Sequence, residues 1–481
     1  MENNNFLHKN VDQQTINNDY SASSGNNTFD GQNLTKGNIL KQLWSLAWPM
    51  MLSVFFYTLY NIVDAFWVSK LSPESIAAVS ISQITLFIMI SLGFGITIGS
   101  GVVMAMYIGA KNIKEAERVL GQSFVLSAIA GVIFTVISLI FRTQLLIASG
   151  ASGLIFDPAL QYFTITAGGS ILFFILITIM FAFNSQGDTF TLTKLFAFST
   201  LINIVLDPIL IFGWFGIPPM GISGAAIATL ISQAAFIVVA IRSLSNPKRN
   251  IRFHFYNLTF KRESVKKVLD IGIPAALTQV INPIGVAALT FITSLGFLEA
   301  GAIAFSLGFR IEFFAYLPAV GFGFGAMAMI GQSIGAGNLE RSKQVFKKAL
   351  KYGFLGAAAL GILAVIFAAQ LTRIFTEDPL VTKYTLYYIW IVALSYGFLA
   401  AMIVEASVFQ SMGRSWPGFW IIFLRFFVLT IPLSYIFTQL LDFSIQAIWI
   451  SLIIGNIISA IFGYIWITKT LNKISFKETP I

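Results

Sequence analysis

The chain has 481 residues, of which 56% are hydrophobic and 11% are charged, and its mean hydropathy is +0.80. Because soluble domains carry roughly 25% charged residues, this composition excludes a water-soluble globular protein. The formal net charge of +9 would suit nucleic-acid binding. The positions of the basic residues explain it by membrane topology instead, so we expect no nucleic-acid partner.

The apolar residues fall in continuous runs of about 20, the length of a membrane-spanning helix, and not in alternating ten-residue strands. We therefore expect an all-α polytopic membrane protein in contact with the lipid bilayer. The absence of cysteine excludes disulfides and thiolate metal sites. His8 and His254 lie outside the apolar runs, which excludes a histidine proton relay inside the membrane.

Residues 1–38 are rich in Asn, Ser, Gln and Gly and predict a disordered cytoplasmic tail. A first set of apolar runs lies near 39–68, 76–106, 119–141, 159–183, 190–213 and 222–244. A second set lies near 265–295, 300–332, 347–370, 383–411, 416–439 and 444–469. These runs predict about 12 transmembrane helices, arranged as an N-terminal six-helix bundle at 39–244, a cytoplasmic linker at 245–264, a C-terminal six-helix bundle at 265–470 and a cytoplasmic tail at 471–481.

Basic residues indicate the orientation, because cytoplasmic loops retain Lys and Arg. With the N-terminus inside, the inner loops and tails near the membrane hold about 23 of the 30 basic residues, and the outer loops about four. We therefore expect a multi-pass protein of the cell membrane with both termini in the cytoplasm.

The two halves resemble each other at an offset near 226 residues. The matches are Pro49 with Pro274, Gly109 to Asn112 with Gly335 to Asn338, and Phe183 to Gly187 with Phe409 to Gly413. An even number of helices separates the copies, so they are parallel repeats. Transporters that rock two bundles about a midplane site have this organisation.

Charged residues inside the predicted spans are functional candidates, because each costs at least about 2.5 kcal/mol in a membrane. Asp64 and Asp207 lie at nearly the same depth of helices 1 and 5, and Asn203 is one turn before Asp207. Pro208 frees the carbonyl of Ile204 as a further oxygen. Two such carboxylates cannot both ionise cheaply, so the cluster is expected to bind a proton or Na⁺. The alternative is a hydrated, passive pair near the membrane surface.

The second bundle offers a different set of charges. Glu405 and Arg425 lie at similar depths and are expected to be close enough to pair, in a structural or a functional role. Arg310 and Glu312 are two residues apart and point in different directions, so we expect at least one of them to line the space between the bundles.

Aromatic residues could form a pocket for flat cations through cation–π contacts. The candidates are Tyr60, Tyr162, Phe183 and Phe196. With 47 Phe in the chain, packing explains any single Phe equally well, whereas Tyr60 shares a helix face with Asp64. No Walker, glycine-rich nucleotide or HExxH motif occurs, so neither ATP-driven pumping nor an enzyme is expected, and no cofactor is predicted.

Four strings together resemble the multidrug and toxic compound extrusion (MATE) transporters, and most closely their archaeal and DinF-like branch. The strings are Leu46 to Pro49, Tyr60 to Val68, Tyr107 to Ala110 and Asn203 to Pro208. The resemblance covers roughly residues 39–470. It implies a monomeric antiporter that exchanges protons or Na⁺ for organic, mostly cationic, drugs.

The resemblance also implies roles for individual residues. Asp64, Asp207 and Asn203 correspond to the coupling site, which could hold Na⁺, and Pro49 to a hinge in helix 1. Tyr60 and Tyr162 match hydrogen-bonding tyrosines of the family, Asn184 lies near its polar position in helix 4, and Thr229 matches a helix 6 hydroxyl. Asn61 and Phe196 complete the set of pocket candidates. Other branches keep an acid in helix 7, and this chain has none between Gly272 and Ser294, so coupling is expected in the first bundle.

Two alternatives remain. A flippase for lipid-linked oligosaccharides or lipid II in the same superfamily would share the repeat, but such proteins usually have fourteen helices and a more basic cavity. A membrane-embedded enzyme or receptor would need a catalytic constellation or a soluble domain, and neither is evident in this sequence.

Overall fold

The computed structural model describes residues 33–249, 251–258 and 261–473, and these residues form helices and turns without a β-strand. Nine of their helices are long and apolar enough to cross a membrane, and the pair α6 (Phe156–Gly168) and α7 (Ser170–Ser185), bent by 51°, makes a tenth span. The 74-residue α10 (Arg262–Gly335) bends at Phe297 and Leu298 into two arms, and α3 (Pro73–Gly109) is also long enough to cross. The predicted twelve-span architecture is confirmed.

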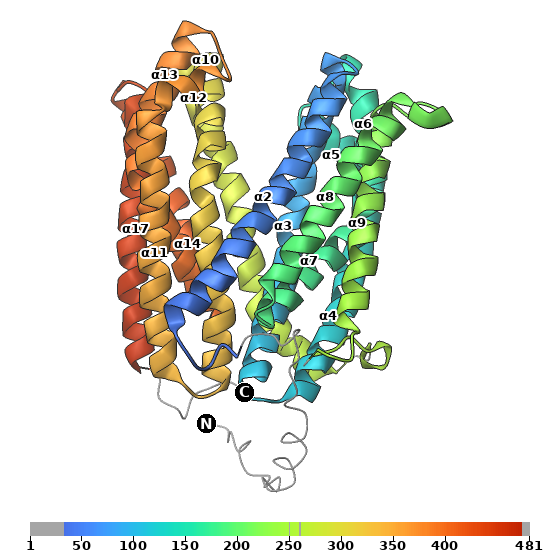
Figure 1. The fold of residues 1–481 in the computed structure, drawn as a ribbon. Coiled ribbons are helices and arrows are strands. Elements are labelled where there is room, and N and C mark those ends of the chain that lie inside the picture. Colours follow the sequence, from blue (N-terminus) through green and yellow to red (C-terminus); the bar gives the residue numbers. More distant parts are fainter. Residues whose placement is uncertain (1–32, 250, 259–260, 474–481) are drawn as a thin grey trace, which may run out of the picture.

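The described spans form two bundles (Figure 1). The first contains α2 (Ile39–Ser69), α3, α4 (Ile113–Ile140), α6 with α7, α8 (Thr189–Phe212) and α9 (Ile222–Leu244). The second contains both arms of α10, α11 (Leu339–Ile366), α13 (Pro379–Val392) with α14 (Tyr396–Ser411), a span from α15 (Trp416–Phe423) through η5 (Leu424–Thr430) and α16 (Ile431–Tyr435) to η6 (Ile436–Leu440), and α17 (Gln446–Lys473). Short helices α5 (Arg142–Ala148) and α12 (Ala368–Arg373) follow α4 and α11.

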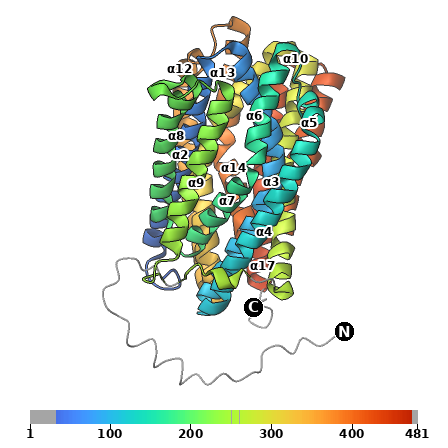
Figure 2. The ribbon, with the colours of Figure 1, turned by 90° about the vertical axis from the view of Figure 1, so that its right-hand side faces the viewer.

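The fourth span of each bundle is irregular, which the continuous apolar runs did not predict. In the first bundle the break lies at Gly169, between α6 and α7. In the second a 3₁₀ turn, η4 (Ala393–Ser395), separates α13 from α14. Figure 2, turned so that the first bundle faces the viewer, shows α6 and α7 as separate pieces.

Helix α2 belongs to the first bundle and also contacts the second. Near its start Trp44 packs edge-on against Phe322 of α10, with ring centroids 5.1 Å apart. Further along, the hydroxyls of Ser53 and Thr193 of α8 are 2.9 Å apart, and Thr200 donates to the carbonyl of Phe56 at 3.2 Å. Figure 1 shows α2 running diagonally between the two groups of helices. A change at its far end can therefore reach the second bundle directly.

The bundles touch where glycines of α3 meet α10. A Cβ atom at Gly109 would lie 1.9 Å from the carbonyl oxygen of Gln332, and one at Gly335 would lie 1.9 Å from that of Met106. Small residues allow such close approach of membrane helices. The Gln332 amide also donates to the carbonyl of Ser185 at 2.8 Å. We call this region the joined end; the bundles diverge toward the opposite end (Figure 1).

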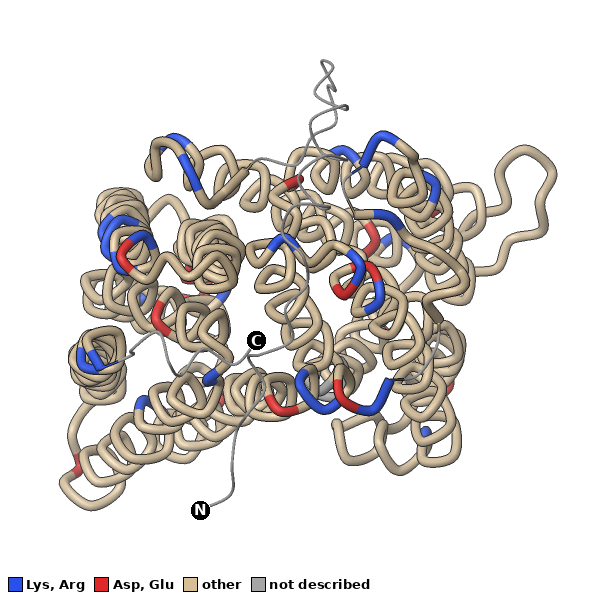
Figure 3. Tube along the Cα trace, turned by 90° about the horizontal axis from the view of Figure 1, so that it is seen from below, with Lys and Arg blue, Asp and Glu red and all other residues tan. Residues whose placement is uncertain are grey.

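Lys and Arg positions gather around the joined end in the view from below (Figure 3). Arg249, in the predicted linker, forms an ion pair with Asp188 at the start of α8, at 2.8 Å. Phe253 packs on Phe124 of α4, with centroids 4.7 Å apart. The described part of the linker is therefore fastened to the first bundle.

The predicted N-terminal tail, residues 1–38, and the C-terminal tail, 471–481, lie mostly outside the described residues. Residues 33–38 are described, and one of them, Leu34, is packed into the protein. Leu34 is fully buried, and its side chain lies against Gly187, in the turn between α7 and α8. The packed chain therefore begins a few residues before the predicted boundary.

Candidate functional site

Two buried carboxylates lie between α2 and α8 of the first bundle. Asp64 is on α2 and Asp207 on α8, with 2% and 0% of their surfaces exposed. Their charges are close enough to interact with each other, and Tyr162 of α6 is close enough to interact with both. Asp64, Asp207 and Tyr162 therefore form one buried cluster.

The hydrogen bonds around the carboxylates are few. The hydroxyl of Tyr162 donates to Oδ2 of Asp64 at 3.5 Å, and the amide of Asn203 donates to Oδ1 of Asp207 at 3.0 Å. In the described part of the chain, neither carboxylate has a Lys or Arg partner. The cluster thus contains two acids and no base.

Three buried oxygens of this cluster have no hydrogen-bond partner among the described residues. They are Oδ1 of Asp64, Oδ2 of Asp207 and Oδ1 of Asn203. Leaving such acceptors unsatisfied is costly, and a proton or a hard cation with oxygen ligands would satisfy them. The donor set therefore fits the expected binding of a proton or Na⁺.

The predicted pocket residues divide into two groups. Tyr60 and Thr229 lie next to each other, and Tyr60 and Tyr162 lie beside the carboxylates. Phe196 is one ring away from this group, because it packs edge-on against Tyr57, which stacks on Tyr60. The remaining candidates have other partners: Asn61 donates to the carbonyl of Tyr57, Phe183 lies under Arg249, and Asn184 donates to the carbonyl of Phe324 at the contact between bundles.

The predicted pairing of Glu405 with Arg425 is wrong. Arg425 instead lies 3.8 Å from Glu312, which accepts a hydrogen bond of 2.5 Å from the hydroxyl of Tyr388. Glu405 is on α14 and lies against Gly463 of α17, while Arg425, on η5, is directed to α10. Similar depth was not enough, because the two helices direct these side chains to different neighbours.

Arg310 and Glu312 lie on different faces of α10, as their spacing predicted. Glu312 is buried in the second bundle, whereas Arg310 is exposed. Sequence reasoning overlooked Tyr388, the hydrogen-bond donor to Glu312. Its position, 226 residues after Tyr162, was the available signal.

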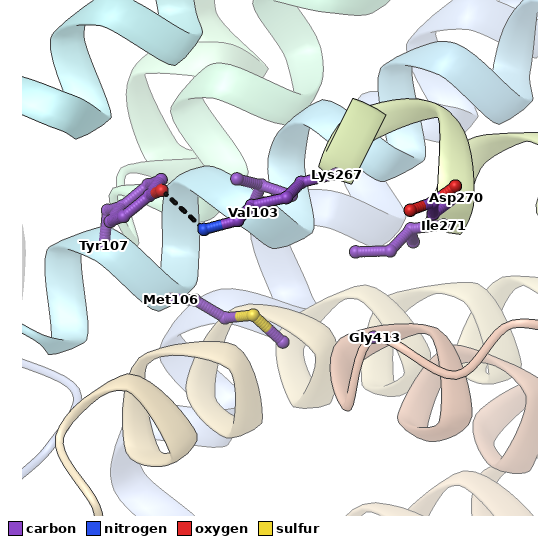
Figure 4. A pocket seen from close by; sticks show the side chains of 7 residues that line it. All are labelled: Val103, Met106, Tyr107, Lys267, Asp270, Ile271 and Gly413. Carbon is purple, nitrogen blue, oxygen red and sulfur yellow. Dashed lines mark hydrogen bonds between the residues drawn. The ribbon is translucent and has the colours of Figure 1, made fainter. Parts of the chain in front are cut away.

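A cavity of about 160 Å³ lies at the joined end (Figure 4). It is lined by Val103, Met106, Tyr107, Lys267, Asp270, Ile271 and Gly413, which come from both bundles. The Lys267 ammonium donates to the hydroxyl of Tyr107 at 3.3 Å. None of the predicted site residues lines this cavity, so it is separate from the carboxylate cluster.

Comparisons with known proteins agree with this architecture. A family model described as MatE matches residues 49–209 and 274–436, one segment in each bundle. The chain is 27% identical to a protein named FAD transporter from Shewanella oneidensis, over 84% of this chain and 89% of that protein. It is also 27% identical to a probable multidrug resistance protein NorM from Thermotoga maritima, over 86% and 89%.

A solved structure of a transporter has the same fold as this chain. A MOP superfamily transporter from Pyrococcus furiosus, described as having a binding pocket of reverse polarity, superposes with a TM-score of 0.88 and 26% identity. The match covers 94% of this chain and 100% of that one. Family segments in both bundles and an agreeing fold confirm the resemblance: the chain belongs to the MatE family of multi-pass membrane transporters.

Proposed function

We propose that this protein exports organic, mostly cationic, compounds, drugs among them, in exchange for protons or Na⁺. Asp64, Asn203 and Asp207 bind the coupling ion. The observation that carries the proposal is the pair of buried carboxylates with free oxygens and no basic partner in the described part of the chain. Relatives named multidrug resistance proteins support the drug class.

Exchange requires that ion and substrate stabilise different conformations, since a ligand with equal affinity for both shifts nothing. A cationic compound is attracted by ionised carboxylates, and bound protons or Na⁺ cancel that attraction. Tyr60 and Tyr162, beside the carboxylates, offer aromatic faces to such a compound. Ion binding therefore expels the substrate, and ion release restores the pocket.

Helix α2 can transmit the change, because it carries Asp64 at one end and packs on α10 at the other. Pro49 lies between these regions and lacks the N–H that would bond the carbonyl of Ser45. The hydroxyl of Thr189 reaches that carbonyl at 3.4 Å, and Thr193 donates to the carbonyl of Pro49 at 2.6 Å. We infer that Pro49 is the hinge of α2.

The remaining parts of the proposal follow from topology. We place the protein in the cell membrane with both termini in the cytoplasm, because basic residues cluster in the predicted inner loops. It works as a monomer, since each chain carries both bundles. It acts as a transporter and not as an enzyme.

The test uses purified protein in liposomes and ethidium as the transported compound, under an imposed pH gradient or Na⁺ gradient. Asp64→Asn and Asp207→Asn are compared with Asp157→Asn, which changes an exposed acid of the same bundle. Gradient-driven transport that is lost in the first two variants and kept in the third supports the proposal, and the active gradient identifies the ion.

Two results would contradict the proposal. Transport that survives both Asp64→Asn and Asp207→Asn would remove the coupling role of the pair. If ethidium is not transported and FAD or a lipid-linked oligosaccharide is, the proposed substrate class of organic cations is wrong and the transported compound takes its place. FAD is included because of the named Shewanella relative, and the lipid because of the flippase alternative.

A further inference from the structure

The internal repeat places two tyrosines in equivalent positions. Tyr162 on α6 and Tyr388 on α13 are 226 residues apart, the same offset as Gly109 and Gly335. Both lie in the first part of the fourth span of their bundle. Each hydroxyl donates to a buried carboxylate, that of Asp64 in the first bundle and that of Glu312 in the second. Each bundle therefore contains a buried polar centre with an equivalent tyrosine. The carboxylates themselves come from non-equivalent spans, Asp64 from α2 and Glu312 from the second arm of α10.

The partner supplied by the fifth span differs between the two centres. In the first bundle that span, α8, supplies the acid Asp207. In the second bundle the fifth span supplies Arg425, which is 5% exposed, lies over the ring of Phe426 and faces Glu312 at 3.8 Å. One centre thus has two acids and no base, and the other has one acid and one base.

Compensation of the buried charges differs in the same way. Asp64 and Asp207 each keep a buried oxygen without a partner among the described residues. Glu312 accepts a hydrogen bond from Tyr388 at Oε2, and Arg425 forms an ion pair with Oε1 at 3.8 Å, although Nε of Arg425 has no hydrogen-bond partner among the described residues. A buried ion pair resists separation, since removing one member leaves the other charge uncompensated.

We propose that the guanidinium of Arg425 is a built-in cation that fills the ion site of the second bundle. Only the first bundle then exchanges an ion with solvent. This inference rests on the proposed function and adds the number of bundles that exchange an ion: the second bundle contributes no ion to the transport cycle. The π-helical winding of η5 around Arg425 is consistent with a specialised position, since such segments are frequent at functional sites.

The experiment measures coupling stoichiometry with the full chain in proteoliposomes. With the membrane voltage held at zero, equilibrium accumulation of ethidium is recorded against a series of pH or Na⁺ gradients. The slope of the logarithmic plot reports the number of ions exchanged. The key variant is Glu312→Gln combined with Arg425→Gln, which removes both charges and keeps polar side chains of similar size.

The inference predicts that this double variant keeps the wild-type slope. A slope that falls in the double variant would show that the second centre exchanges an ion, and would overturn the inference. Asp64→Asn is measured in parallel: if it keeps a full slope, the proposed function fails independently of Arg425.

A folding defect is distinguished by a second measurement. If the double variant does not fold, Arg425→Lys takes its place in the stoichiometry assay. This variant retains a cation beside Glu312, so we expect it to keep the wild-type slope. Binding of ²²Na⁺, with Na⁺ as probe, or proton uptake is then measured in protein carrying both Asp64→Asn and Asp207→Asn. Residual binding that disappears on adding Glu312→Gln would overturn the inference, and its absence supports it.

Discussion

Arg341, in the first turn of α11, donates from Nε to the backbone carbonyl of Leu34 at 2.8 Å. The same guanidinium donates to the carbonyls of Gly37 and Lys36 and to the side chain of Gln42. The segment before α2 is thereby held on the second bundle, while Leu34 packs against Gly187 of the first. This contact bridges the bundles at their joined end, so we expect it to stabilise the conformation in which that end is closed.

Replacement of Arg341 by Gln should shift the population toward a conformation open at the joined end. Charge-assisted hydrogen bonds contribute about 1.5–3 kcal/mol each, so loss of several would change a two-state ratio by at least about tenfold. Because the chain has no cysteine, spin labels at Lys111→Cys and Gly337→Cys can report the separation. Arg142→Gln, at an exposed position, is the control. An unchanged distance distribution in Arg341→Gln would contradict the role of this contact.

Close packing of α3 and α10 at the joined end should also respond to added volume. In Gly335→Ala the new Cβ would meet the backbone oxygen of Met106 at 1.9 Å, which cannot rotate away. We expect the thermal unfolding temperature to fall, by an amount corresponding to about 1–3 kcal/mol of overpacking. Gly168→Ala is the matched control, since nothing lies within 4 Å of its Cβ. Equal unfolding temperatures in the two variants would argue against this contact.

The amides of Asn203 and Asn61 were both site candidates, and the structure separates them. Asn203 holds Asp207 and keeps a free buried oxygen, whereas Asn61 donates to the backbone of Tyr57. We expect Asn203→Ala to lower ion-driven transport by about tenfold or more, the loss of one charge-assisted hydrogen bond. Asn61→Ala should stay within about twofold of wild type. The reverse order in a proteoliposome assay would reject this assignment.

Glu405 is a buried acid with no assigned role. It is 1% exposed, and neither carboxylate oxygen has a partner among the described residues. Glu405→Gln should preserve transport and raise or maintain thermal stability, since it removes an unpaired acid from the interior. Loss of gradient-driven transport in a folded Glu405→Gln protein would make Glu405 an ion site instead.

The sequence was sufficient to predict the number of spans and the two bundles. Hydrophobic length and helix geometry determine these features, and both are local properties of the chain. The partner of Arg425 was not predictable in this way, because it depends on which neighbouring helix each side chain faces. The 3₁₀ turn between α13 and α14 was missed for a related reason: the apolar run continues through η4.

The hinge role of Pro49 makes a final prediction. Pro49→Ala restores an N–H that can bond the carbonyl of Ser45, so α2 should become straighter and stiffer while the fold is kept. We expect slower exchange with little change in substrate affinity, measured as a lower maximal transport rate at an unchanged half-saturating ethidium concentration. Pro73→Ala is the control, because Pro73 occupies the first turn of α3, where the missing N–H has no helical partner. If both variants transport at the wild-type rate, the change at Asp64 must reach α10 through α2 moving as a rigid rod.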